Sequence, residues 1–154
     1  MVKTNNAKKD AASGDLLLLD NQLCFALYSA SLAMTRLYKP LLEKLGLTYP
    51  QYLVMLALWE QDSLSVSELG ARLSLDSGTL TPLLKRLEVN ALVSRLRAVD
   101  DERRVHVTLT AAGRRLRTSA AKVPGCILEA SQCSVSEITA LTRQVQALRD
   151  HLLA

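Results

Sequence analysis

The sequence predicts a mainly α-helical protein with a small β-hairpin near its middle. Apolar residues recur at intervals of three and four along most of the chain, which is the period of amphipathic helices. The interval changes to two between residues 92 and 109, where short strands are therefore expected. A length of 154 residues, with 49% hydrophobic and 22% charged residues, fits one folded domain and excludes a disordered chain.

The first helix is expected to begin near Leu16, after a polar and flexible arm formed by residues 1–13. Its apolar positions continue to Tyr38. Pro40 should bend or end the helix because proline has no backbone N–H to donate. Gly46 suits the left-handed conformation that follows many helices, so the segment should stop there.

Two of the next helices begin with a capping box, in which Ser or Thr is followed three residues later by Glu or Gln. Thr48 with Gln51 starts a helix that should end near residue 60, and Ser65 with Glu68 starts a short one that should end near residue 73. Another helix is expected after a tight connection. This layout is that of a helix-turn-helix.

Pro82 lies inside the second helix of this pair. The proline is tolerated if the regular helix begins near Thr79, but it would kink a helix that begins at Ser77. Two short strands, 92–97 and 105–109, should follow, joined by a charged turn at 98–104. A helix-turn-helix followed by a hairpin is a winged helix.

Thr110 can cap the helix after the hairpin, which the Pro124–Gly125 pair should interrupt. The last helix, which starts at Ser134, carries an apolar stripe that the hairpin is too small to cover, so the stripe needs a partner surface. We expect one domain over residues 14–154, with the winged helix-turn-helix at 47–110 and homodimer interface helices at 14–46 and 111–154. The stripe comprises Ile138, Leu141, Val145, Leu148 and Leu152.

The formal net charge of +4 is concentrated in the middle of the chain, which predicts a polyanionic partner. A membrane surface is disfavoured because one Trp and one Phe provide few aromatic anchors. Double-stranded DNA fits better, since a recognition helix places side chains in the major groove while a wing reaches the backbone and the minor groove. Arg103 is the expected wing contact, oriented by its acidic neighbours, which include Asp101. The expected contacts on the helix are Ser77, Thr79, Thr81, Lys85 and Arg86.

Three cysteines, Cys24, Cys126 and Cys133, form neither an even disulfide framework nor a zinc-binding spacing. They suggest a reducing compartment, and because neither a secretory signal nor a membrane-spanning segment is evident, we expect a cytoplasmic protein. No nucleotide-binding or acyl-transfer motif is present, and neither histidine has neighbours at ligand spacing. No metal, cofactor or enzymatic activity is therefore expected.

Cys24 stands among apolar residues, where a thiol is ordinarily buried and inert. Tyr38 lies 14 residues further along the same expected helix, which is roughly 21 Å at a rise of about 1.5 Å per residue. The phenol cannot reach the thiol of its own chain. If Tyr38 and Tyr49 serve this thiol, they must come from a second subunit, as the dimer expected for a palindromic operator would allow.

These motifs together resemble the MarR family of transcriptional regulators and, within it, the organic-hydroperoxide-sensing OhrR subfamily. The resemblance runs from about residue 20 to the C-terminus. The helix-turn-helix and the wing are common to MarR repressors, whereas the cysteine with two tyrosines at these spacings is specific to the sensing branch. The matching segments are Leu23–Tyr28, Tyr38, Tyr49–Tyr52, Leu75–Glu88 and Asp101–Arg103.

The resemblance implies a homodimeric repressor that binds an inverted-repeat operator when reduced and leaves it when organic hydroperoxides oxidise Cys24. It implies that Tyr38 and Tyr49 hydrogen-bond the partner's thiol and that Arg95 belongs to the DNA-binding wing together with Arg103. A disulfide with a second thiol of the other subunit would follow.

The resolving thiol of that disulfide is open. Two-cysteine sensors commonly use the first cysteine of a C-x-x-x-C pair before the last helix, but Glu129 stands at that position in this chain. Cys126 and Cys133 both remain candidates, with a slight preference for Cys126.

Two other functions compete with this one. The first is a MarR-type repressor released by a small aromatic ligand, with Cys24 incidental. The second is a thiol peroxidase, which would need a basic thiolate site that is not evident around Cys24, although Arg36 could belong to one.

Overall fold

The computed structural model describes residues 15–154. The chain divides between Leu37 and Tyr38 into two units. The expected arm at residues 1–13 lies outside the described residues. In the first unit a short 3-10 helix, η1 (Leu19–Asn21), precedes α2 (Leu23–Glu43), whose larger part belongs to this unit.

The prediction that a helix begins near Leu16 was wrong. Gln22 is extended (φ −87°, ψ 114°) and separates η1 from α2. Its side chain donates to the carbonyl oxygens of Leu16 and Leu18, and the Asn21 side chain donates to the Asp15 carbonyl at 2.7 Å. These side chains take the backbone acceptors that a continuous helix would have used.

The second unit begins within α2, which continues through Pro40 to Glu43, so the helix does not end at the proline. Gly46 then adopts φ +70°, which confirms the expected left-handed residue. Helix α3 (Tyr49–Glu60) follows, and both hydrogen bonds of the Thr48–Gln51 capping box are present.

The helix-turn-helix consists of α4 (Val66–Leu73) and α5 (Ser77–Val89). The Ser65–Glu68 capping box starts α4 as expected. Helix α5 begins at Ser77, so Pro82 is inside it, at the sixth helical residue. The core beneath these helices is aliphatic, because Leu69, Leu80 and Leu87 are completely excluded from solvent.

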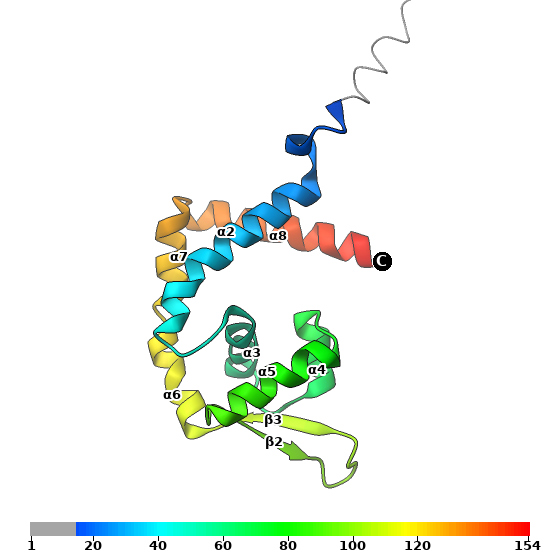
Figure 1. Cartoon of the computed structure of the whole chain (residues 1–154), viewed down its shortest axis with the longest axis vertical. Coiled ribbons are helices and arrows are strands. Elements are labelled where there is room, and N and C mark those ends of the chain that lie inside the picture. The colour runs from blue at the N-terminus through cyan, green and yellow to red at the C-terminus, as the bar shows by residue number, and fades with distance from the viewer. Residues whose placement is uncertain (1–14) are drawn as a thin grey trace, which may run out of the picture. The chain divides into compact units, whose positions relative to one another are not determined.

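The hairpin strands are β2 (Val93–Arg97) and β3 (Val105–Leu109), as the alternating pattern predicted. Figure 1 shows the hairpin of β2 and β3. A third strand, β1 (Leu64–Ser65), pairs with the other side of β3, which gives the antiparallel order β1-β3-β2. Strand β1 was not predicted, since two residues cannot show an alternation. The winged helix is confirmed, and β2 is an edge strand of its sheet.

Helix α6 (Ala111–Ala120) is capped by Thr110, whose side chain accepts the N–H of Gly113 at 3.0 Å. A Cβ at Gly113 would lie 2.1 Å from the Leu92 carbonyl oxygen, so the close approach of α6 to the backbone of Leu92 requires glycine. Helix α6 ends before Pro124. The proline is in the first turn of α7 (Val123–Ser131), so it begins a helix rather than interrupting one.

The last helix, α8 (Val135–Leu153), starts with the predicted capping box between Ser134 and Glu137. None of its residues is buried. The apolar stripe along α8 is therefore uncovered in the single chain, as the sequence analysis expected.

Candidate nucleic-acid interface and thiol site

The N-terminus of α5 is held by Asp76. Its carboxylate accepts the backbone N–H of Thr79 at 2.8 Å and the Thr79 hydroxyl at 3.1 Å. The backbone and side-chain hydrogen bonds from Thr79 lower the pKa of Asp76, so the carboxylate is ionised. Ser77 and Thr79 are exposed beside this cap, and Thr81 is half-buried.

Lys85 and Arg86 are exposed on α5, whereas Leu80, Leu84 and Leu87 on the same helix are buried. The helix is thus fixed by one apolar face and presents hydroxyl and cationic side chains elsewhere. All five predicted recognition-helix residues belong to this one element.

The wing turn is ordered by Asp101. Its side chain accepts the backbone N–H of Arg103 at 3.0 Å, and its carbonyl accepts the N–H of Arg104 at 2.9 Å. Arg103 is exposed. A groove of about 460 Å³ lies between the start of α4, helix α5 and the hairpin, and Thr81, Arg95 and Arg103 are among its lining residues.

Arg95, which the sequence analysis placed among the DNA contacts, is bound to Glu88 in this structure. Its Nε and Nη2 atoms lie 2.9 Å and 2.7 Å from Glu88 Oε2. The hydrogen bond from Arg95 lowers the pKa of Glu88. The wing therefore contains an arginine that is already paired and another, Arg103, that is exposed.

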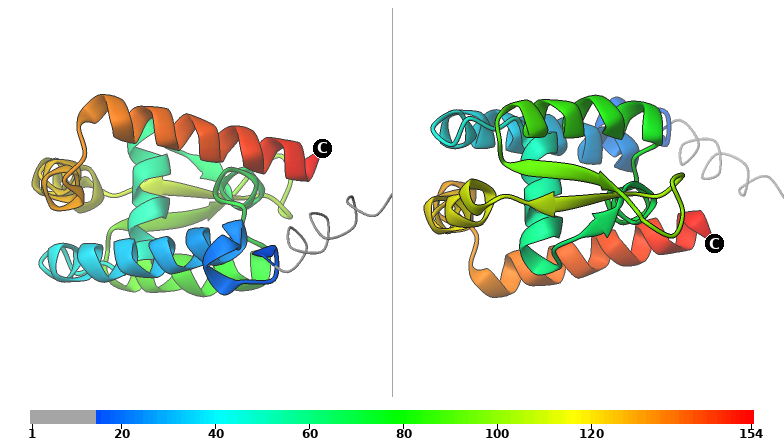
Figure 2. Two further views of the ribbon diagram at one scale, coloured as in Figure 1. Left: turned by 90° about the horizontal axis from the view of Figure 1, so that it is seen from above. Right: turned by 90° about the horizontal axis from the view of Figure 1, so that it is seen from below.

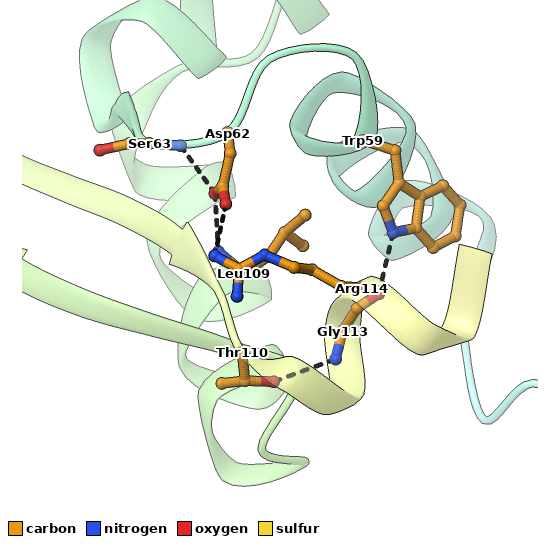
Figure 3. Close-up of polar contacts among 7 residues, drawn as sticks. All are labelled: Trp59, Asp62, Ser63, Leu109, Thr110, Gly113 and Arg114. Atoms are coloured by element: carbon orange, nitrogen blue, oxygen red, sulfur yellow. Dashed lines mark hydrogen bonds and ion pairs between the residues drawn. The ribbon is translucent and has the colours of Figure 1, made fainter.

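Asp62 joins three elements behind the wing (Figure 3). Its Oδ1 atom accepts the N–H groups of Ser63 and Leu109, both at 2.8 Å, and its Oδ2 accepts from Arg114 at 2.9 Å. Burial alone would raise the pKa of Asp62, but the hydrogen bonds from Leu109 and Arg114 outweigh burial and lower it. The junction ties the end of α3 to β3 and α6, and no sequence motif indicated it.

Trp59 makes a parallel connection between α3 and α6 by donating its indole N–H to the Gly113 carbonyl at 2.9 Å (Figure 3). The two connections fix the base of the hairpin.

Three tyrosines cluster where α2 ends and α3 begins. The ring centroids of Tyr38 and Tyr49 are 4.9 Å apart, and Tyr52 lies 5.8 Å from Tyr38 and 6.4 Å from Tyr49. Burial, with the neighbouring phenols, raises the pKa of Tyr38 to about 12, and burial also raises those of Tyr49 and Tyr52. All three phenols therefore keep their protons at neutral pH.

Tyr38 and Tyr49 were predicted to hydrogen-bond the same thiol of the partner subunit, and Tyr52 was not part of that prediction. Its spacing of three residues from Tyr49 on a helix was the available signal. Tyr52 is 3% exposed, so it supports the rings of the other two from the inside.

The cysteines differ in accessibility. Cys24 on α2 and Cys126 on α7 are exposed, and all three thiols are free. Cys133 is half-buried after α7, where its backbone N–H and its thiol both approach Ser131. The expectation that an isolated Cys24 would be buried in its own chain was wrong.

The part of the chain that the structure describes contains no cluster of three or more His, Cys, Asp or Glu side chains that could hold a metal ion. Over the same residues, no helix is both long and apolar enough to cross a membrane.

Comparison with known proteins identifies the family. The family model for the SarA/Rot transcriptional regulators matches residues 36–119. The organic hydroperoxide resistance transcriptional regulator of Bacillus subtilis (strain 168) is 48% identical over 138 residues, which cover 90% of this chain and 94% of that protein. The chain belongs to the OhrR subfamily of the MarR family. The resemblance seen in the sequence motifs is thereby confirmed.

Solved structures of another MarR-type regulator, AbfR of Staphylococcus epidermidis, share the fold. Reduced AbfR bound to DNA is 34% identical, with a TM-score of 0.75 over 92% of this chain and 99% of that chain. AbfR with a disulfide formed is 35% identical, with a TM-score of 0.61 over 94% and 98% of the two chains. As a MarR regulator, the chain is a DNA-binding transcription factor and not an enzyme.

Proposed function

We propose that this regulator is a repressor switched by thiol oxidation. The reduced homodimer binds an inverted-repeat operator in the cytoplasm, and oxidation of Cys24 by an organic hydroperoxide releases it. The observation that carries the proposal is the cluster of Tyr38, Tyr49 and Tyr52, whose ring centroids lie 4.9–6.4 Å apart and whose raised pKa values keep the phenols protonated. A phenol that donates to sulfur favours the thiolate, which is the form that attacks a peroxide.

The uncovered stripe of α8 supports the dimer, because a soluble helix with an apolar face needs a covering surface. In the dimer, Cys24 of the partner subunit meets the tyrosines of this chain. The apolar residues around Cys24, such as Leu23 and Phe25, favour an organic peroxide over hydrogen peroxide.

The DNA contacts in this proposal are the exposed side chains of α5 and the wing. Ser77, Thr79 and Thr81 meet base edges or phosphates near the helix start, and Lys85 and Arg86 follow two turns on. Arg103, held by the Asp101 turn, enters the minor groove, whose narrow segments attract arginine.

Oxidation proceeds in two steps. The Cys24 thiolate attacks the peroxide, an S–O bond forms as the O–O bond breaks, and sulfur is oxidised to sulfenic acid while the departing alkoxide takes a proton from water and becomes the alcohol. A second thiol then forms an S–S bond as the S–O bond breaks, and water leaves. Cys126 is our preferred resolving thiol because it is exposed, whereas Cys133 is half-buried against Ser131.

The test is DNA binding by fluorescence anisotropy with the protein's own upstream DNA. One equivalent of cumene hydroperoxide should release the reduced wild type, and dithiothreitol should restore binding. Cys24→Ser should bind DNA and should stay bound after the peroxide is added. Equal release of Cys24→Ser, or release of neither protein, would contradict the proposal and favour a repressor released by a small aromatic ligand.

Nonreducing electrophoresis identifies the resolving thiol. Cys126→Ser should lose the crosslinked dimer after peroxide treatment, while Cys133→Ser should retain it. The reverse pattern would assign Cys133.

A further inference from the structure

The contact between Glu88 and Arg95 connects the recognition helix to the wing. Glu88 is in the last turn of α5, and Arg95 is the central residue of β2. The carboxylate receives the guanidinium on Oε2, at 2.9 Å from Nε and 2.7 Å from Nη2, and the backbone N–H of Arg95 on Oε1 at 3.4 Å. One side chain of the helix thus holds both the side chain and the backbone of the strand.

This pair is more constrained than an ordinary surface ion pair. The Arg95 side chain is 26% exposed, and two nitrogen atoms of its planar guanidinium, Nε and Nη2, contact the Glu88 carboxylate. Because β2 is the edge strand of the sheet, the carboxylate also satisfies a backbone N–H that no neighbouring strand receives. The contact therefore acts on the orientation of the strand.

That orientation matters for the surface proposed above. Seen from below, α5 runs beside the hairpin (Figure 2). The two elements line the groove that contains Thr81 and Arg103. A recognition helix in the major groove and a wing in the minor groove must keep a fixed separation to bind one duplex.

We propose that Arg95 is a positioning residue which, through Glu88, sets the wing relative to α5, and that Arg95 does not contact DNA. This replaces the role that the family resemblance gave to Arg95. It rests on the proposed function, since α5 and the wing must be the DNA-binding surface.

The decisive variant is Glu88→Gln, because the two roles predict opposite signs. If Glu88 positions the wing, its neutralisation weakens DNA binding, by about fivefold for a partly exposed charged pair. If Arg95 binds DNA and Glu88 merely competes for it, Glu88→Gln strengthens binding. Glu102→Gln, which neutralises an exposed carboxylate in the wing turn, is the control for the general effect of removing a negative charge.

Variants of Arg95 give a second test. Arg95→Lys keeps the charge but loses the two-point contact, so it should weaken binding as much as Arg95→Gln does. The slope of log affinity against log salt should stay unchanged in Arg95→Gln, whereas Arg103→Gln should reduce it by about 0.9. The double variant Glu88→Gln with Arg95→Gln should be no weaker than either single variant.

Hydroxyl-radical footprinting separates positioning from general destabilisation. Glu88→Gln should lose the hydroxyl-radical protection of the minor groove facing the wing, while dimethyl sulfate should still find guanine N7 protected in the major groove contacted by α5. A reduced salt slope in Arg95→Gln, near-normal binding by Arg95→Lys, or stronger binding by Glu88→Gln would overturn the proposal. Failure of the wild type to bind its upstream DNA would instead overturn the proposed function, so the two failures are distinguishable.

Discussion

The winged helix and the last helix bury their apolar side chains to very different extents. Leu69, Leu80 and Val107 in the winged helix are completely excluded from solvent, whereas α8 has no buried residue and Leu141 on its stripe is 55% exposed. The winged helix completes its core within one chain, but α8 cannot. The surface proposed to bind DNA is therefore specified by a single chain, and the surface proposed for the dimer depends on a second one.

The largest effect should come from the core of the winged helix. Leu69→Ala should lower the free energy of unfolding by about 2–5 kcal/mol, because a completely buried leucine leaves a cavity. Urea denaturation at two protein concentrations checks this. The difference from the wild type should be the same at both concentrations, and a difference confined to the dilute sample would place Leu69 in the dimer interface instead.

Leu141→Asp tests the other side of the comparison. A carboxylate on the α8 stripe should weaken the dimer by about a hundredfold, because a charge would be buried without a partner. Sedimentation equilibrium measures the change. Gln146→Asp, on the opposite side of the helix, is the matched control, and equal dimer affinities for the two variants would rule out the stripe as the interface.

Asp62→Asn tests a polar junction inside the winged helix. Loss of the carboxylate weakens the hydrogen bonds from Leu109 and Arg114 and should lower stability by about 1–2 kcal/mol. Because the folded pKa of Asp62 is lowered, its contribution is present above the unfolded pKa near 3.8 and is lost as pH falls through the folded value. The wild type and the variant should therefore converge in acid. A constant difference down to pH 2 would contradict this assignment.

Tyr38→Phe should give the smallest effect. The folded pKa of Tyr38 is about 12, above its usual value of 10.0, so its burial stabilises the fold below pH 10 and this contribution is lost as pH rises towards 12. Absorbance at 295 nm should show that Tyr38→Phe removes one ionisation near pH 12. Tyr28→Phe, which changes an exposed tyrosine on α2, should leave that ionisation in place.

Local signals predicted most of the fold. Capping residues placed the starts of α3, α4, α6 and α8, and alternation placed β2 and β3. The errors arose where side chains or short segments overrode the pattern. Gln22 and Asn21 stop a helix that the leucines before them favour, and the pairing of β1 is visible only in three dimensions.

The candidate sites were less predictable because their key contacts join distant residues. Asp62 bonds Leu109 and Arg114, which lie 47 and 52 residues away in the sequence. Arg95 was expected to belong to the DNA-binding wing, and its ion pair with Glu88 forms only because the fold brings the two side chains together. Tyr52 was not singled out because it lies among the buried residues of the apolar helix α3.

The hydrogen bond between Thr79 and Asp76 determines what Thr79 can offer to a base. An ionised carboxylate only accepts, so the Thr79 hydroxyl uses its single hydrogen on Asp76 Oδ2. The Thr79 hydroxyl oxygen then has only lone pairs available for a DNA base, so it can accept a hydrogen bond but not donate one. In the proposed interface, Thr79 would therefore discriminate by hydrogen-bond polarity, favouring the amino groups of cytosine N4 or adenine N6 over the acceptor edges of guanine or thymine.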